Sequence, residues 1–494
     1  MRAGVVSVMP AFTDLAGLPM TCHTGLLRDY LRGQLGFDGV IVSDYNAIAE
    51  LIKHGVAADL PDAAARALAA GVDIDMMSDA YRHGLPVALE RGAASMAQID
   101  TAVRRVLTLK LRLGLFDDPY RRGATPEAPD AIAQRRQLAR SVAARSIVLL
   151  KNTGEALPLD ASLRSLAVLG PLAAATGEMR GPWWAAGTED MNVNVVDGLR
   201  AALPGVQIRH AAGVAIEGDD HGAIADAVAA CDGAQAVVLC LGEAASRANP
   251  ALPGEQQALA EAVAAHARER GVPLVVVLFS GRPLVVPWLA ERADALLAAW
   301  FLGCEAGNAL ADVLTGRVSP SGRTPMSWPR AVGQVPVFFG QRPTGRPADP
   351  RDKFTSKYLD VANEPLYPFG HGLSYGKFTI DGLRVSAATI KLGQSIAVEV
   401  EVTNAGTRAA EETVFLFTRD KLASVARPLL ELRGFGKITL APGARGTVRM
   451  ALAAEQLRFL GADLQPVFEP GEVEVLAGPC ADRACLLGTT IALE

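Results

Sequence analysis

The chain has 494 residues, of which 50% are hydrophobic and 20% are charged, a balance typical of a globular protein with several domains. The formal net charge of −5 is small for this length, and neither a basic block nor an acidic tail is present, so nucleic acid is not an expected partner. The longest apolar runs have the length of a strand and are too short to span a bilayer, so we expect no membrane insertion.

Residues 1–120 show strands alternating with helices, which predicts a parallel sheet covered by helices. The patterns indicate strands at 4–9, 39–43 and 71–77, and helices at 24–35, 63–70 and 99–113. A closed (β/α)₈ barrel needs eight strands, so these three cannot close one, and we expect a partial (β/α) barrel segment.

A polar linker at 121–135 separates this segment from a second α/β region at 136–340. Apolar runs there predict an open doubly wound α/β sheet with strands at 147–150, 166–169, 236–241, 274–279 and 295–299, and with helices that include 256–270 and 307–314.

A Pro- and Gly-rich interdomain loop region follows at 341–377. From 378 to 494 the pattern changes to short alternating strands, which predicts a β-sandwich with strands that include 396–402, 412–418, 446–452 and 471–476.

The stretch at 39–51, GVIVSDYNAIAEL, joins a strand to a helix. Its β-branched run at 40–42 is typical of a strand buried on both faces, and Asn46 is predicted to cap the helix that follows. Asp44 would then lie at the carboxyl end of a parallel strand, where β/α folds build their active sites. The alternative is a carboxylate that only caps a helix or braces a loop.

Five collinear stretches resemble glycoside hydrolase family 3, close to its bacterial periplasmic β-glucosidase branch. They are LLRDYLRGQLGFDGVIVSDYNAIAELIKHG (26–55), RSIVLLKN (145–152), WFLGCEAGNALADVLTGRVSPSGRTPMSWPR (300–330), YPFGHGLSYG (367–376) and RPLLELRGFGKITLAPG (427–443). The resemblance implies that 378–494 is a fibronectin-III-like domain and that 1–120 is the C-terminal part of a (β/α)₈-type barrel domain. The N-terminal part of that barrel, with a Lys-His pair, an Arg and an Asp that hold the sugar, has no counterpart in this sequence.

The resemblance also implies two catalytic carboxyl groups, as retaining glycosidases require. Asp44 matches the family's nucleophile, in agreement with its predicted strand-end position. The segment Glu243-Ala244-Ala245-Ser246-Arg247 resembles the family's acid/base segment, which makes Glu243 the expected acid/base. Relatives often carry a Gly-Glu at the strand end and a second acidic residue several positions later, whereas this loop is shorter. Glu243 could match either position, and if it matches only the first, the proton donor is absent.

Four residues are expected to bind substrate. Tyr45 replaces a Trp common in the family, and its ring could stack on a sugar or simply pack. Arg180, Trp183 and Trp184 lie in a Gly-rich loop, GEMRGPWWAAG, that resembles one lining the entrance of the family's site. Two adjacent Trp residues in a loop favour sugar stacking over core packing.

We therefore expect a retaining exo-β-glycosidase that removes terminal β-glucosyl residues from short oligosaccharides or β-glucosides, with xylosides as second substrates. The alternative is a non-catalytic or assembly-dependent remnant that needs a separate chain, or a homo-oligomer, to complete the barrel. The six scattered cysteines lack metal-ligand spacing, and we expect neither a metal nor a cofactor. The resemblance suggests the periplasm, although Met1 is followed by no signal-peptide pattern.

Overall fold

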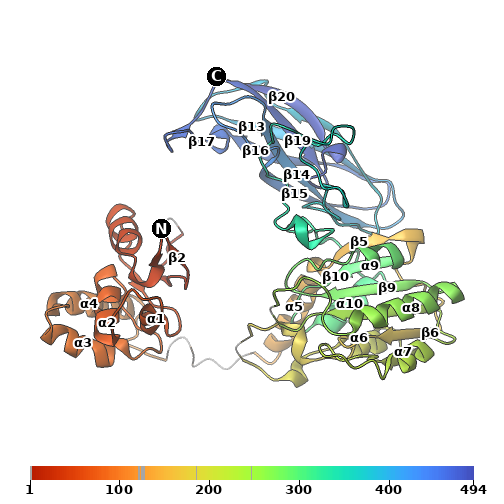
Figure 1. The fold of residues 1–494 in the computed structure, drawn as a ribbon, viewed down its shortest axis with the longest axis horizontal. Helices are drawn as coiled ribbons and strands as arrows, with labels where there is room; N and C mark the ends of the chain where they lie inside the picture. Colours follow the sequence, from red (N-terminus) through yellow and green to blue (C-terminus); the bar gives the residue numbers. More distant parts are fainter. Residues whose placement is uncertain (1–2, 121–122, 124–127, 185, 246) are drawn as a thin grey trace. The chain divides into compact units, whose positions relative to one another are not determined.

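The computed structural model describes all residues except 1–2, 121–122, 124–127, 185 and 246. The chain divides into two compact units, Met1–Pro129 and Asp130–Glu494, and each is described by itself. Figure 1 labels their helices and strands.

The first unit contains short strands and several helices. In chain order its elements are β1 (Ser7–Val8), β2 (Asp14–Leu15), β3 (Leu18–Pro19), the 3₁₀ helix η1 (Met20–Cys22), the π-helix η2 (Gly25–Gln34), β4 (Val40–Ile41), α1 (Ala47–Lys53), α2 (Leu60–Ala70), α3 (Ala80–Glu90) and α4 (Met96–Arg112). β1 and β4 pair in parallel, as the strand–helix alternation predicts.

The strand predicted at 71–77 is reduced to a single parallel bridge between Val42 and Ile74. The reason lies in Asp73, whose carboxylate accepts the Ile41 N–H at 2.8 Å. A side chain thus takes a backbone donor that a regular ladder would pair with a carbonyl group, and the ladder stops. Asp73 is also bound by Arg32 and Arg105 at 2.5 and 3.0 Å, so it braces this part of the sheet.

The prediction that Asn46 caps α1 is correct for its position and wrong for its side chain. Asn46 does precede the helix, but it has φ +60° and its side chain makes no capping hydrogen bond. Its N–H group donates to Met76 O at 2.8 Å, and the Ala47 N–H is taken by Asp44 O at 3.2 Å. A left-handed backbone suits Asn, and here the residue turns the chain between strand and helix.

The second unit begins with an α/β sheet covered by helices on both faces. Its longer elements are α5 (Ala131–Ser146), β5 (Val148–Asn152), β6 (Ser165–Leu169), α6 (Val195–Ala202), β7 (Gln207–Ala211), α7 (Ile224–Ala230), β8 (Ala236–Gly242), α8 (Gln256–Arg270), β9 (Leu274–Phe279), α9 (Pro287–Arg292), β10 (Ala295–Ala298) and α10 (Ala306–Leu314). Short 3₁₀ turns are η3 (Thr153–Glu155), η4 (Gly177–Arg180), η5 (Glu189–Met191) and η6 (Val332–Gln334).

The sheet order is β5-β10-β9-β8-β6-β7, with the edge strand β5 antiparallel to β10 and the other pairs parallel. β8 and β9 are buried along their whole length because both faces are covered. One face packs against α5, α6 and α10, and the other against α7, α8 and α9. Active residues of such a sheet are expected at the carboxyl ends of its parallel strands.

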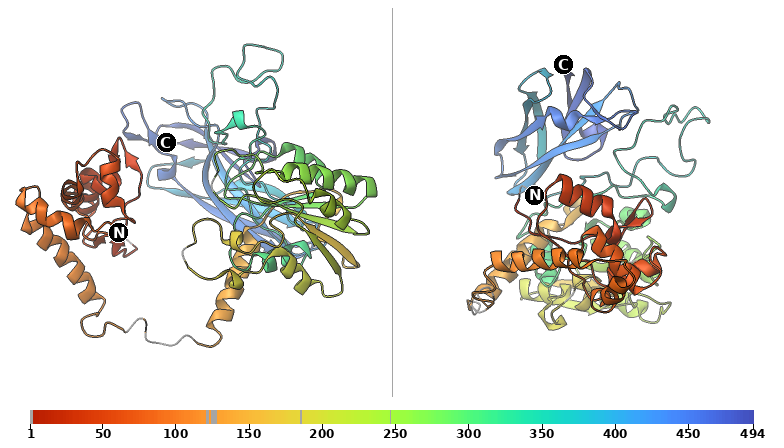
Figure 2. Two further views of the ribbon diagram at one scale, coloured as in Figure 1. Left: turned by 60° about the horizontal axis from the view of Figure 1, so that its bottom comes forward. Right: turned by 90° about the vertical axis from the view of Figure 1, so that its left-hand side faces the viewer.

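An irregular stretch follows α10, and from Phe378 onward the unit is a β-sandwich, with two sheets packed face to face in Figure 2. One sheet has the order β11-β13-β16 and the other β12-β20-β19-β14-β15. The elements are β11 (Phe378–Val385), β12 (Thr389–Ile390), β13 (Ser395–Asn404), β14 (Ala410–Asp420), β15 (Glu431–Leu440), β16 (Arg445–Ala453), η7 (Ala454–Leu457), β17 (Phe459–Leu460), β18 (Pro466–Val467), β19 (Gly471–Gly478), η8 (Arg483–Cys485) and β20 (Leu487–Leu493).

Across the described residues, no helix combines the length and the apolar character that crossing a membrane would require.

Candidate active site

Asp44 lies at the carboxyl end of β4 in the first unit. The preceding residues Val40 and Ile41 are buried, and Asp44 is half-buried where the chain leaves the sheet. The position agrees with the sequence prediction, because the apolar run keeps the strand in the core until the polar residues begin.

Hydrogen bonds fix the backbone around this carboxylate. Asp44 Oδ1 accepts the Tyr45 N–H at 2.7 Å. The neighbouring Ser43 side chain is buried, donates to Asp44 O at 3.0 Å and accepts the Met76 N–H at 2.8 Å. One carboxylate oxygen is thus oriented by the backbone, and the other, Oδ2, has no hydrogen bond from the described residues.

Tyr45 is 60% exposed, so its ring is not a core residue. The sequence allowed the Tyr45 ring either to stack on a sugar or to pack inside the unit, and this exposure disfavours packing.

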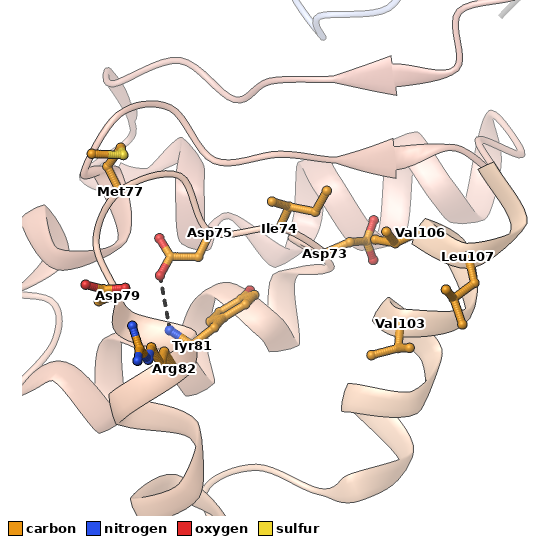
Figure 3. Close-up of a pocket in the computed structure, with 10 residues that line it drawn as sticks. All are labelled: Asp73, Ile74, Asp75, Met77, Asp79, Tyr81, Arg82, Val103, Val106 and Leu107. Carbon is orange, nitrogen blue, oxygen red and sulfur yellow. Dashed lines mark hydrogen bonds between the residues drawn. The ribbon is translucent and has the colours of Figure 1, made fainter. Parts of the chain in front are cut away.

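A cavity of about 390 Å³ lies in the same unit, and sequence reasoning missed it. Figure 3 shows that one side comes from the segment after Asp73 and the other from α4; its lining includes Asp75, Met77, Tyr81, Arg82, Val103 and Leu107. Asp75 accepts the Tyr81 N–H at 3.1 Å, and the Tyr81 hydroxyl donates to Val72 O at 2.6 Å. Burial, with Asp73 and Asp75 nearby, raises the pKa of Tyr81 well above its ordinary value. The tyrosine is therefore a fixed, neutral wall of the cavity.

Glu243 directly follows β8 in the second unit, and the glycine before it is required. Gly242 has φ +142°, and a Cβ at this position would lie 1.8 Å from Phe279 O. The Glu243 N–H donates to that same carbonyl at 2.8 Å, so the backbone of Glu243 still belongs to the edge between β8 and β9. The Gln256 amide holds the Gly242 peptide from the other side, with bonds of 2.8 Å to its N–H and to its C=O.

The Glu243 side chain is buried, with 3% of the residue exposed, and Arg282 binds both of its oxygens. Arg282 Nε lies 3.3 Å from Oε1, and Nη2 lies 3.1 Å from Oε2. Arg282 follows β9 and was not singled out from the sequence; the only signal is a Ser-Gly-Arg-Pro turn after an apolar run. Both Glu243 oxygens are thus bound by Arg282 in this conformation, and the role of Glu243 as acid/base stays a prediction. Ser246, part of the same predicted segment, lies outside the described residues.

The loop with Arg180, Trp183 and Trp184 follows β6, the parallel neighbour of β8, so both loops leave the sheet at one edge. The Arg180 guanidinium stacks on the Trp184 ring at 3.8 Å, and its Nη1 donates to Ala186 O at 3.2 Å. Trp183 is 91% exposed. Of the two indoles, Trp184 is therefore held by a cation–π contact, and Trp183 offers its ring to solvent.

Among the residues that the structure describes, no group of three or more His, Cys, Asp or Glu side chains lies close enough together to hold a metal ion.

Comparison with known protein families matches three stretches of the chain. Residues 1–109 match the glycosyl hydrolase family 3 N-terminal domain, residues 147–375 match its C-terminal domain, and residues 412–480 match a fibronectin type III-like domain. The chain thus combines a partial (β/α) barrel segment, an open doubly wound α/β sheet and a fibronectin-III-like sandwich, as the sequence predicted.

The chain is 42% identical to a periplasmic β-glucosidase of Salmonella typhimurium, over 97% of its own length and 66% of the relative's. It is 37% identical to a β-xylosidase of Formosa agariphila, over 97% of its own length and 68% of the relative's. The crystal structure of a β-glucosidase from Listeria innocua with isofagomine superposes with a TM-score of 0.90 at 38% identity, over all of this chain and 69% of that one. The chain belongs to glycoside hydrolase family 3. It spans about two thirds of the length of these relatives.

Proposed function

We propose that the chain is a retaining exo-β-glycosidase that hydrolyses terminal β-glucosyl residues of oligosaccharides or β-glucosides, with Asp44 as its nucleophile. The observation that supports this most is Asp44, a half-buried carboxylate at the carboxyl end of β4 with one oriented oxygen. In the first step this carboxylate attacks the anomeric carbon and the aglycone leaves; in the second, water attacks the glycosyl ester and frees Asp44.

Trapping the ester tests this proposal directly. A deoxyfluoro β-glucoside with a dinitrophenolate leaving group should label the peptide that contains Asp44, detected by mass spectrometry. Asp44→Asn should lower turnover of a dinitrophenyl β-glucoside by at least about 10⁴-fold, because no other group can form the ester. Asp14→Asn, at an exposed carboxylate of the same unit, is the matched control. Labelling elsewhere, or an active Asp44→Asn variant, would overturn the assignment.

The choice between glucosides and xylosides rests on the relatives' names, since one is a β-glucosidase and another a β-xylosidase. We propose glucosides as the main substrates because the β-glucosidase is the more similar of these two relatives. Comparing the kcat/KM values of matched aryl β-glucosides and aryl β-xylosides decides this point.

A second proposal concerns assembly, and the surface of the first unit supports it. Met77, Val103, Leu107 and Leu111 are all exposed, and the first three line the cavity of Figure 3. An apolar helix face of this kind next to a strand edge usually packs against further strand–helix units. We propose that a partner segment, from another polypeptide or a second copy, covers this face, and that activity depends on it. Unchanged activity in a strictly monomeric chain would refute this dependence.

A further inference from the structure

We infer that Glu243 acts as a buried clamp together with Arg282 rather than as a proton donor, and that the substrates are therefore β-glycosides whose aglycone leaves without protonation. This inference rests on the proposed function of Asp44. It narrows the proposed substrates to β-glucosides of acidic phenols and leaves out oligosaccharides, whose leaving sugar hydroxyl needs a proton.

The first step is the inaccessibility of the Glu243 carboxylate. A general acid must approach the leaving oxygen to about 2.6–3.2 Å, directly or through one water. Both Glu243 oxygens instead face the Arg282 fork, in a residue that is 3% exposed. The backbone is held as well, since the Glu243 N–H is bonded to Phe279 O and the Gly242 peptide to Gln256, so exposing the carboxylate requires a side-chain rotation that breaks both Arg282 contacts.

The second step is what the Arg282 guanidinium does besides binding Glu243. Its Nη2 donates to Asn249 O at 2.8 Å and its Nη1 to Ala248 O at 3.4 Å. The pair therefore fixes the middle of the loop that follows β8. A bidentate carboxylate–guanidinium contact is well suited to this positioning role, because it sets direction as well as distance.

The third step is the lack of a replacement in the same loop. The sequence between Glu243 and Glu255 contains no Asp or Glu. Glu255 pairs with His221 at 3.3 Å and directly precedes α8. A carboxylate from another segment, Glu217, contacts this loop, and Arg247 Nη1 binds its Oε1 at 2.6 Å.

These contacts define which glycosides can react. Attack by Asp44 forms the C–O ester bond at the anomeric carbon and breaks the bond to the aglycone, which departs with the electron pair as an anion. A phenolate with electron-withdrawing groups tolerates this charge, whereas an alkoxide or a sugar hydroxyl needs a proton. In the second step water attacks, Asp44 leaves as the carboxylate, and the proton passes to the solvent. Azide ion, which has no proton to lose, should discharge the ester faster than water does.

Kinetics with a series of β-glucosides tests the inference. Dinitrophenyl, nitrophenyl, phenyl and methyl β-glucosides and cellobiose share the sugar and differ in the aglycone. For the wild-type chain, kcat/KM should fall from the dinitrophenyl to the methyl compound, and this fall should be at least about 10²-fold larger than in an enzyme with a proton donor. Added azide should yield β-glucosyl azide. Glu243→Gln should change all compounds by one common factor. A selective loss of about 10²–10⁴-fold on cellobiose with Glu243→Gln, or with Glu217→Gln, would overturn it by identifying a donor.

Melting temperatures give a readout that does not depend on activity. Glu243→Gln and Arg282→Met should each lower the melting temperature of the second unit by several degrees, and the double variant should lose no more than the worse single one, because the two groups act as a unit. The exposed pair Glu155–Lys377 is the control, and Glu155→Gln should leave the melting temperature unchanged. Additive changes in melting temperature, or none, for the Glu243 and Arg282 variants would overturn the clamp.

A wild-type chain that is inactive on dinitrophenyl β-glucoside would instead overturn the proposed function and its substrate class. The melting temperatures of the variants would still test the clamp in that case.

Discussion

Asp73 is the most deeply buried charge of the first unit, and its removal should be costly. Its side chain is fully buried between Arg32 and Arg105, with ion-pair distances of 2.5 and 3.0 Å. Asp73→Asn leaves Arg32, itself 7% exposed, without its counter-ion and weakens the bond to the Ile41 N–H. We expect a loss of about 3–5 kcal/mol in the free energy of unfolding of this unit, measured by urea titration.

The matched control for this prediction is Asp38, which pairs with Arg112 on the surface of the same unit. Asp38→Asn removes an exposed ion pair and should leave the urea midpoint unchanged. Equal midpoints for the two variants would show that burial does not make Asp73 special.

At the residue scale, the sequence reveals those side chains whose neighbours along the chain are informative. Asp44 was singled out because the apolar run at 40–42 ends just before it and the stretch resembles the family's nucleophile segment, and Glu243 because its loop resembles the family's acid/base segment. The partner of Glu243 could not be found in this way. Arg282 is separated from it by 39 residues and reaches it only because β8 and β9 are neighbours in the sheet.

The loop at 367–376 connects the α/β sheet to the sandwich. Its residue His371 should make the free energy of unfolding of the second unit depend on pH. The His371 ring is half-buried, stacks on Tyr367 at 4.7 Å, and its Nε2 lies 2.8 Å from Leu150 O. Burial lowers the pKa of His371, the Leu150 carbonyl partly opposes this, and Arg323 lowers the pKa further. The imidazole is therefore neutral in the folded protein at pH values where it is already charged in the unfolded chain.

The sign of the pH effect follows from this difference. The unfolded chain binds the extra proton below about pH 6.5, so the contribution of His371 is fully present above that pH and declines as the pH falls through the lower, folded pKa. His371→Gln keeps a donor for the Leu150 carbonyl but does not titrate. Guanidinium unfolding at several pH values between about 5 and 7 should give a flatter stability profile for the variant. Parallel profiles for the two proteins would contradict the prediction.

At the scale of elements, the strands of the second unit were predictable where burial is complete. β9 and α8 begin and end at the predicted residues, because an all-apolar run and a long helix bounded by Gly271 leave little freedom. β7 was missed because it is an edge strand, QIRHA, with exposed polar residues. α3 was missed because Gly84 and Pro86 interrupt its pattern, and β15 because it contains Gly434 and Gly436.

At the scale of the whole molecule, the two units differ in how they cover their apolar surfaces. The six-stranded sheet of the second unit has helices on both faces. The first unit has only the strand pairs β1-β4 and β2-β3 and one bridge among its described residues, and α4 leaves Val103, Leu107 and Leu111 exposed. Three apolar side chains at spacings of four residues form one stripe along a helix, which favours packing against another element over a solvated surface.

This stripe leads to the prediction that the chain associates through the first unit. Burying the stripe removes apolar area from water, and pairing the free edge of the short strands satisfies backbone groups. In light scattering the wild-type chain should show a mass above the 51.8 kDa of a single copy, rising with concentration. A double variant, Val103→Lys with Leu107→Lys, places charges on the stripe and should shift the mass toward the monomer.

The control uses Leu422, which is 88% exposed in the second unit and lies outside the stripe. Leu422→Lys removes a similar apolar side chain, so it should leave the association unchanged if the stripe is responsible. Circular dichroism of each variant checks that the helices are retained. A monodisperse wild-type monomer with an ordered first unit would contradict the prediction, because such a chain would keep the stripe and the strand edge in water without a partner.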